Sequence, residues 1–174
     1  MKPEYFDFVN NIIGETPTRI NSKYFSAGLR DRYYWTNIHF EKNFIDKNIT
    51  LSDILESGKT DRDKSLCITK RYEGYQGSQS YLRRRYFGKS MGQAVFEGVE
   101  PSIQKAKWKD DDRKDWENIG VIRPLTTLEC ERIQTLPEGY VSVVLGDTPK
   151  AKGIIGNGWT VDVIAHILKG VKNV

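Results

Sequence analysis

The sequence has few residues of the kinds that build metal sites, disulfide scaffolds or membrane spans. Its 174 residues include two cysteines, Cys67 and Cys130, and two histidines. Neither cysteine has another Cys or a His near it at metal-ligand spacing, which excludes a disulfide scaffold and a cysteine-based zinc site. Hydrophobic runs such as 140–145 and 163–168 are much shorter than the roughly 20 residues of a membrane helix. The start of the chain also has no apolar stretch typical of a secretory signal. We therefore expect a cytoplasmic protein that does not cross a membrane.

The residues that are present indicate a globular protein. Hydrophobic residues make up 38% of the chain and charged residues 29%, which is neither a disordered nor a fibrous composition. The length favours one domain, or one domain with an insertion. The net charge of +4 is by itself weak evidence for a polyanionic partner.

Positive charge is concentrated between residues 70 and 89. Six basic residues lie there against the single acid Glu73, and tyrosine, glycine and glutamine are interspersed. Arginine can contact phosphate or guanine, and glutamine can read adenine. The stretch therefore predicts DNA contacts by Arg71, Gln76, Gln79, Arg83, Arg84, Arg85 and Lys89. The alternative is a solvated basic loop beside the acidic stretch 105–117, and residue types alone do not decide between the two.

Regular elements are predicted mainly at the two ends of the chain. The patterns predict a helix over 4–13, a hairpin of strands 19–25 and 32–38, a short helix capped by Ser52 and ended by Gly58, an irregular stretch to about 119, and helices over 127–134 and 159–168. Two paired strands alone leave apolar faces uncovered. The regular elements therefore look like part of something larger.

Three segments, in order, resemble the eighth, ninth and tenth motifs of DNA (cytosine-5) methyltransferases, bacterial and phage-type enzymes above all. Residues 20–38 resemble Gln-x-Arg-x-Arg running into a strand, and residues 123–140 resemble Arg-x-Leu-Thr-x-x-Glu-x-x-Arg-x-Gln-x-Phe-Pro-x-x-Tyr. Residues 155–164 resemble Gly-Asn-Ser-x-x-Val. About 80 residues separate the first two segments, where the family has its variable target recognition domain. The resemblance is therefore to the C-terminal half of these enzymes.

The resemblance implies an α/β fold of which this chain holds only an edge. That edge is the hairpin and closing helices of a partial Rossmann-like methyltransferase sheet, with an inserted irregular α+β target recognition domain. The implied division is the end of the catalytic domain at 1–39, the target recognition domain at 40–120, and the closing helices of the catalytic domain at 121–174.

The sequence also departs from the family pattern. Gly28 replaces the Gln of the eighth motif, and Gly158 replaces the Ser of the tenth. The Phe-x-Gly-x-Gly cofactor loop, the Pro-Cys nucleophile and the Glu-Asn-Val acid of the family are absent. No Pro precedes Cys67, and Cys130 lies between two glutamates whose charges oppose a thiolate. We expect neither cysteine to be a nucleophile.

Site roles follow from the resemblance, residue by residue. Arg32 matches the arginine that contacts the flipped cytosine, and Arg30 matches its neighbour beside phosphate and active site. Asn157, Gly158 and Trp159 match the cofactor pocket, where a helix N-terminus would present N–H groups to the methionine carboxylate. The alternatives are a salt-bridged arginine pair at a strand start, and a plain helix cap with a core tryptophan. By the same match, Arg123, Glu129 and Arg132 organise the recognition domain, whereas the helical pattern predicts His166 to be a satisfied core residue.

The resulting hypothesis is a catalytically incomplete part of a DNA (cytosine-5) methyltransferase. Because the chain starts at a natural-looking Met1, we expect a subunit of a split enzyme that binds double-stranded DNA. A larger methyltransferase subunit would carry the catalytic Cys, and S-adenosylmethionine would bind only in that complex. The alternatives are a catalytically inactive DNA-binding or regulatory protein derived from such an enzyme, and a decoy that inserts into a host methyltransferase.

Overall fold

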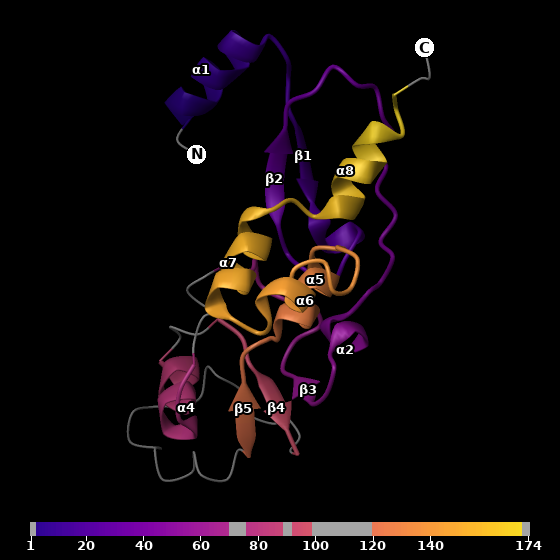
Figure 1. Cartoon of the computed structure of the whole chain (residues 1–174). Coiled ribbons are helices and arrows are strands. Elements are labelled where there is room, and N and C mark those ends of the chain that lie inside the picture. The colour runs from indigo at the N-terminus through magenta and orange to yellow at the C-terminus, as the bar shows by residue number, and fades with distance from the viewer. Residues whose placement is uncertain (1–2, 70–75, 89–91, 99–119, 172–174) are drawn as a thin grey trace.

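The computed structural model describes residues 3–69, 76–88, 92–98 and 120–171. Over these residues it is a mixed α/β structure with two small antiparallel sheets (Figure 1). The elements in chain order are α1 (Pro3–Ile13), β1 (Thr18–Asn21), the 3-10 helix η1 (Ser22–Tyr24), β2 (Asp31–Tyr34), α2 (Leu51–Ile54), β3 (Lys59–Thr60), α4 (Gln79–Phe87), β4 (Val95–Glu97), β5 (Val121–Arg123), α5 (Thr127–Ile133), α6 (Ser142–Leu145), α7 (Pro149–Asn157) and α8 (Val161–Leu168).

The predicted hairpin is present, but its strands are shorter than expected. β1 and β2 pair antiparallel, with Ile20 opposite Arg32. β1 ends at Asn21 because the side-chain oxygen of this residue accepts a hydrogen bond from the Lys23 N–H at 3.0 Å and so caps η1. The expected strand 19–25 therefore becomes a strand followed by a turn of 3-10 helix.

The predicted N-terminal helix is confirmed as α1, and it ends before Gly14, which has φ +73°. It contacts the end of the hairpin through Phe6, whose ring lies 4.9 Å from that of Tyr33 and 6.0 Å from that of Trp35. The Trp35 indole also donates a hydrogen bond to the Asn10 side chain at 2.8 Å. Val9 is half-buried, whereas Tyr5, Phe8, Ile12 and Ile13 of α1 are exposed.

The middle of the chain is more regular than predicted. The short helix α2 is present, but Thr50 and not Ser52 is its cap, because Thr50 and Asp53 form a reciprocal capping box. β3, β4 and β5 form a three-stranded antiparallel sheet, which the sequence did not predict. α4 was also missed, and it places the three consecutive arginines on a helix rather than in a loop.

The C-terminal helices pack against a central core. α5 confirms the predicted helix over 127–134, and α8 confirms the helix within 159–168. α6 and α7 were not predicted. The sequence pattern indicates that 156–158 open the final helix, whereas Gly156 and Asn157 are the last two residues of α7. The central core joins α2, α5, α7 and β4 through Ala27, Leu51, Ile54, Ile68, Val95, Leu125, Cys130, Ile133 and Ile155.

Two smaller cores lie beside the central one. α8 packs on the hairpin through Val163 and Ile167, which contact Ile20 and Phe25. α4 packs on β4 and β5 through Leu82 and Tyr86, at the end of the molecule away from the hairpin (Figure 1). In the described part of the chain, no helix has the length and apolar character needed to span a bilayer.

Candidate functional site: the arginine pair and the segment after helix α7

Arg30 joins two parts of the chain that lie far apart in sequence. It stands directly before β2, and its Nη1 donates a hydrogen bond to the Gly156 carbonyl at 3.0 Å. The same nitrogen lies 3.3 Å from the Cys67 sulfur. The segment that resembles the eighth motif therefore meets the segment that resembles the tenth.

Arg32 lies on β2 and is exposed. Its Nη1 donates to the Asp31 carbonyl at 2.8 Å, and its Nη2 lies 3.7 Å from the Cys67 sulfur. Burial raises the pKa of the nearby Tyr34 phenol, and the positive charges of Arg30 and Arg32 partly oppose that shift. Both positive charges thus act on the same phenol, although Arg32 is exposed and Arg30 bonds to the protein.

The two cysteines have different surroundings. Cys67 is half-buried between the two guanidinium groups, whereas Cys130 is fully buried in the central core. The glutamates beside Cys130 have other partners, Glu129 the Arg123 side chain and Glu131 the N–H groups of Gly139 and Val141 before α6. The expectation that neither cysteine is a nucleophile stays a prediction.

Gly28 occupies the position where the family motif has Gln, and packing explains the replacement. A Cβ on Gly28 would lie 2.6 Å from Cγ2 of Ile133, closer than real Cβ contacts come. The backbone here is held by the Ser22 hydroxyl, which donates to the Gly28 carbonyl at 2.6 Å, and by a bridge to Ser65. These backbone contacts of Gly28, rather than those of a Gln side chain, hold the segment that leads to Arg30 and Arg32.

The proposed cofactor segment is at the end of a helix, and this corrects the sequence interpretation. Asn157 is the last residue of α7 and Gly158 is its C-cap, with the Gly158 N–H bonded to the Ile155 carbonyl at 3.1 Å. The N–H groups that begin α8 are also occupied, Val161 by the Gln134 carbonyl at 2.9 Å and Asp162 by the Thr135 hydroxyl at 2.9 Å. A cofactor carboxylate would have to displace these internal partners to bind the α8 N-terminus.

Gln134 is the residue of this site that sequence reasoning missed. It is buried, and its Nε2 donates to the carbonyls of Ile155 at 3.2 Å and Gly158 at 3.5 Å. Its Oε1 accepts a hydrogen bond from the Thr160 hydroxyl at 2.7 Å. Gln134 therefore holds the segment 157–160 through its backbone and through Thr160. Its match to the Gln of the ninth motif was the feature of the sequence that could have identified it.

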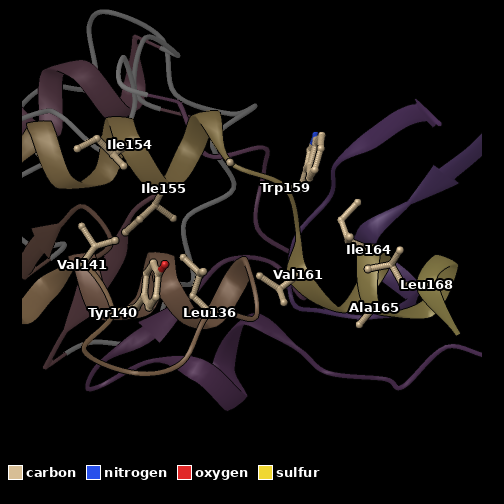
Figure 2. Close-up of a pocket in the computed structure, with 11 residues that line it drawn as sticks. Leu136, Tyr140, Val141, Ile154, Ile155, Trp159, Val161, Ile164, Ala165 and Leu168 are labelled. Carbon is tan, nitrogen blue, oxygen red and sulfur yellow. The ribbon is translucent and has the colours of Figure 1, made fainter. Parts of the chain in front are cut away.

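An apolar groove of about 410 Å³ lies beside this segment. Figure 2 shows Trp159, Ile154 and Val161 around it, together with Tyr140 from the turn before α6. Trp159 is 65% exposed, so it is not a core tryptophan. Asn157 and Gly158 are exposed as well. The groove offers an aromatic and aliphatic surface with little hydrogen-bonding capacity of its own.

Some of the predicted DNA-contact residues bond within the protein, and others are exposed. Gln79 is engaged within the protein, since its amide bonds both the N–H and the carbonyl of Ile122 at 2.8 and 2.9 Å. Arg83 donates to the Gly120 carbonyl at 2.5 Å, and Arg84 and Arg85 lie over the Tyr81 ring at 5.9 and 5.1 Å from its centroid. Gln76 and Arg84 are exposed, while Arg71 and Lys89 lie outside the described residues.

The remaining candidates have structural contacts. Arg123 bonds Glu129 and also Glu97 on β4, and Arg132 donates to the Ile54 carbonyl at 3.0 Å. His166 has a hydrogen-bond partner as expected, since its Nε2 lies 2.7 Å from the Glu41 carbonyl oxygen, but it is half-buried and not a core residue. Within the described ranges no cluster of His, Cys, Asp or Glu could hold a metal ion.

Comparison with known proteins supports the sequence resemblance. No curated protein matches the sequence. A solved structure of a methyltransferase from Entamoeba histolytica is similar to this chain, with a TM-score of 0.59 and 16% sequence identity. The match covers 97% of this chain and 59% of that one, so the chain spans little more than half the length of its structural relative.

The family comparison covers almost the whole chain. The model of the C-5 cytosine-specific DNA methylase family matches residues 9–173. This range contains the hairpin with Arg30 and Arg32, the sheet of β3, β4 and β5, and all the helices from α2 to α8. The chain belongs to the C-5 cytosine-specific DNA methylase family.

Proposed function

We propose that this chain is the C-terminal, DNA-recognising half of a DNA (cytosine-5) methyltransferase of the bacterial and phage type. The observation that carries the proposal is the hydrogen bond from Arg30 to the Gly156 carbonyl. This bond supports the proposal because it joins the hairpin that carries Arg32, the match to the arginine that holds the target cytosine, to the segment that matches the cofactor pocket. A DNA-binding protein that carried out no base chemistry would need no such juxtaposition.

In this proposal the division of the chain is the one that the motifs imply. Residues 1–39 and 121–174 belong to the catalytic domain, and residues 40–120 form the target recognition domain. Exposed Arg84 and Gln76 contact duplex DNA together with Arg71 and Lys89, whereas Gln79 and Arg83 hold α4 in place. Arg32 donates from its guanidinium to the flipped cytosine, because an extruded base needs fixed polar partners on its Watson–Crick edge.

The cofactor of this reaction is S-adenosylmethionine, which supplies the methyl group. The residues present fit one side of such a pocket. Asn157 can bind a polar part of the cofactor, and Trp159 can pack on an apolar or aromatic part, since both are exposed beside the apolar groove. They do not complete the pocket, because the glycine-rich loop of the family is absent from the sequence.

The missing parts would come from a larger subunit that carries the cofactor loop, the Pro-Cys nucleophile and the Glu-Asn-Val acid. Two apolar surfaces support this proposal. One is the groove, with Ile154 and Leu168 about half exposed, and the other is the outer face of α1, where Phe8 and Ile12 are 61% and 69% exposed. Apolar side chains that a partner subunit would cover are expected to be exposed in this way in the isolated chain. The 41% of the Entamoeba relative that this chain does not match would correspond to the missing subunit.

The test is methyl transfer from labelled cofactor to duplex DNA. The chain alone should transfer no label, and a mixture with a candidate protein that carries the three missing motifs should transfer label to cytosine. The R32Q variant should fold normally, because Arg32 is exposed, and should lose transfer in the mixture. Transfer by the chain alone, or an active mixture that tolerates R32Q, contradicts the proposal.

A further inference from the structure

We propose that Arg30 is a positioning residue, which holds the segment 156–159 in register with Arg32 and uses Cys67 as a shared acceptor. The consequence of this arrangement, the alignment of cofactor and cytosine, rests on the proposed function. The arrangement itself can be tested even if the proposed function is wrong. The role differs from that of Arg32, because Arg30 acts through the protein and not on the base or a phosphate.

The contacts of Arg30 point into the protein. One nitrogen, Nη1, serves both the Gly156 carbonyl at 3.0 Å and the Cys67 sulfur at 3.3 Å, and it has two hydrogens with which to do so. The Nε atom is buried and has no hydrogen-bond partner among the described residues. Two of the three Arg30 guanidinium nitrogens, Nε and Nη1, thus face the protein, whereas the Arg32 side chain is exposed.

The acceptor on Gly156 is one of the carbonyls at the end of α7. The last carbonyls of a helix lack partners within it, and a positive charge beside them is favourable. Here Gln134 occupies the carbonyls of Ile155 and Gly158, and Arg30 occupies that of Gly156. Arg30 and Gln134 thus secure the end of α7 from two sides, directly before the exposed Asn157 and Trp159.

Gly156 makes this close approach possible. A Cβ at this position would lie 2.9 Å from the Ile68 carbonyl oxygen, a contact that real Cβ atoms do not make. α7 therefore meets the segment containing Cys67 at backbone distance. Only glycine fits at position 156, because any side chain would collide with the backbone of Ile68.

Cys67 connects the two arginines. Its sulfur lies 3.3 Å from Nη1 of Arg30 and 3.7 Å from Nη2 of Arg32. The segment around Cys67 is itself held to the hairpin by backbone hydrogen bonds between Ser65 and both Ala27 and Leu29, at 2.7 and 2.8 Å. The sulfur is therefore a fixed acceptor between the arginine that holds α7 and the arginine that faces solvent.

Hydrogen exchange of the full chain, without DNA or cofactor, tests the arrangement. In R30Q the amides of Asn157 and Gly158 should exchange about tenfold faster, because a hydrogen bond to a charged donor stabilises by at least that factor. The matched control is R19Q on the same hairpin, where Arg19 pairs with Asp31 at the surface. Unchanged exchange in R30Q, or equal acceleration in R19Q, overturns the proposal.

A pair of substitutions at Cys67 keeps the proposal testable if R30Q does not fold. C67S retains a small acceptor and C67V removes it at similar size. We expect the C67S variant to exchange as the native chain does at residues 156–158, and the C67V variant to exchange several-fold faster there. Equal behaviour of the two variants overturns the role of Cys67 as an acceptor.

Salt-dependent binding of duplex DNA separates positioning from direct contact. If Arg30 does not touch phosphate, R30Q should retain the native slope of log affinity against log salt. A slope reduced by about one in R30Q would mean a phosphate contact and overturn the proposal. If the native chain binds no duplex at all, the proposed function fails, while the exchange experiments still decide the role of Arg30.

Discussion

Arg123 and Glu129 form a two-pronged ion pair between β5 and α5. The two terminal nitrogens of Arg123 each lie 2.8 Å from a carboxylate oxygen of Glu129, which is fully buried. Burial disfavours the charge of Arg123, but the hydrogen bonds that it donates to Glu129 and Glu97 prevail and raise its pKa. Because the N–H groups of Thr126 and Glu56 also donate to Glu129, this residue joins the sheet of β3, β4 and β5 to α2 and α5 at one point.

We expect E129Q to lower the free energy of unfolding by about 3 kcal/mol, since it removes the fully buried charge partner of Arg123 and leaves that guanidinium with Glu97 alone. Urea denaturation of the native chain and the variant measures this difference. R19Q, which breaks the exposed pair of Arg19 and Asp31, should change the stability little. Equal effects of the two substitutions would contradict the structural importance of the buried pair.

Q79A tests whether Gln79 is structural. The side chain supplies both a donor and an acceptor to the Ile122 backbone, so the substitution should lower the free energy of unfolding by about 1–2 kcal/mol. Q76A, which changes an exposed residue just before α4, should leave stability unchanged. Thermal unfolding of both variants checks this, and a stable Q79A protein with weakened DNA binding would favour the original reading of Gln79 as a base contact.

Substitutions at Arg84 and at Arg83 test the proposed DNA interface by comparison with each other. Arg84 is exposed, so R84Q should leave stability unchanged and reduce the salt slope of duplex binding by about one. Arg83 is bonded to the Gly120 carbonyl, so R83Q should reduce stability more than R84Q does. Fluorescence anisotropy across a salt series gives the slopes, and identical slopes for native and R84Q would remove Arg84 from the interface.

Glu131 makes the free energy of unfolding depend on pH in the acidic range. Its burial would raise its pKa, but the N–H groups of Ser142, Val141 and Gly139 and the Ser142 hydroxyl hold the pKa below the ordinary value of 4.5. The folded form therefore binds the proton less readily than the unfolded form. This contribution to stability is complete above the unfolded pKa and is lost as the pH falls through the folded pKa.

The variant E131Q lacks this titration. The difference in unfolding free energy between native chain and variant should be largest near neutral pH and should shrink as the pH falls from about 6 to about 3. Urea denaturation at several pH values measures it. A difference independent of pH would show that the charge of Glu131 is not what stabilises the turn before α6.

Local patterns predicted the helices in which several apolar residues recur at helical spacing without a run of charge between them. α1, α5 and α8 were predicted because their apolar residues recur at helical spacing. α4 was missed because its buried residues, among them Leu82 and Tyr86, are separated by arginines that dominate the composition. β3, β4 and β5 contain only two or three residues each, too few for an alternating pattern to stand out.

The candidate site was only partly predictable for a related reason. The motif resemblance pointed to Arg30, Arg32 and the segment 157–159, but it could not show that Gly158 caps one helix instead of beginning the next. That depends on α7, which starts at Pro149 with Thr148 as its cap. The contacts of Gln134 also depend on tertiary structure, because its partners lie 21 to 26 residues further along the chain.

The sequence by itself determined the order and spacing of the three motif segments, the family resemblance that they carry, and the distance along the chain between the arginine pair and Gly156. Only the tertiary structure decided that Arg30 faces the protein while Arg32 faces solvent. The physical reason is that residue type sets what a guanidinium can bind, whereas the packing of Gly156 against Ile68 and of Gly28 against Ile133 sets which acceptors come within its reach.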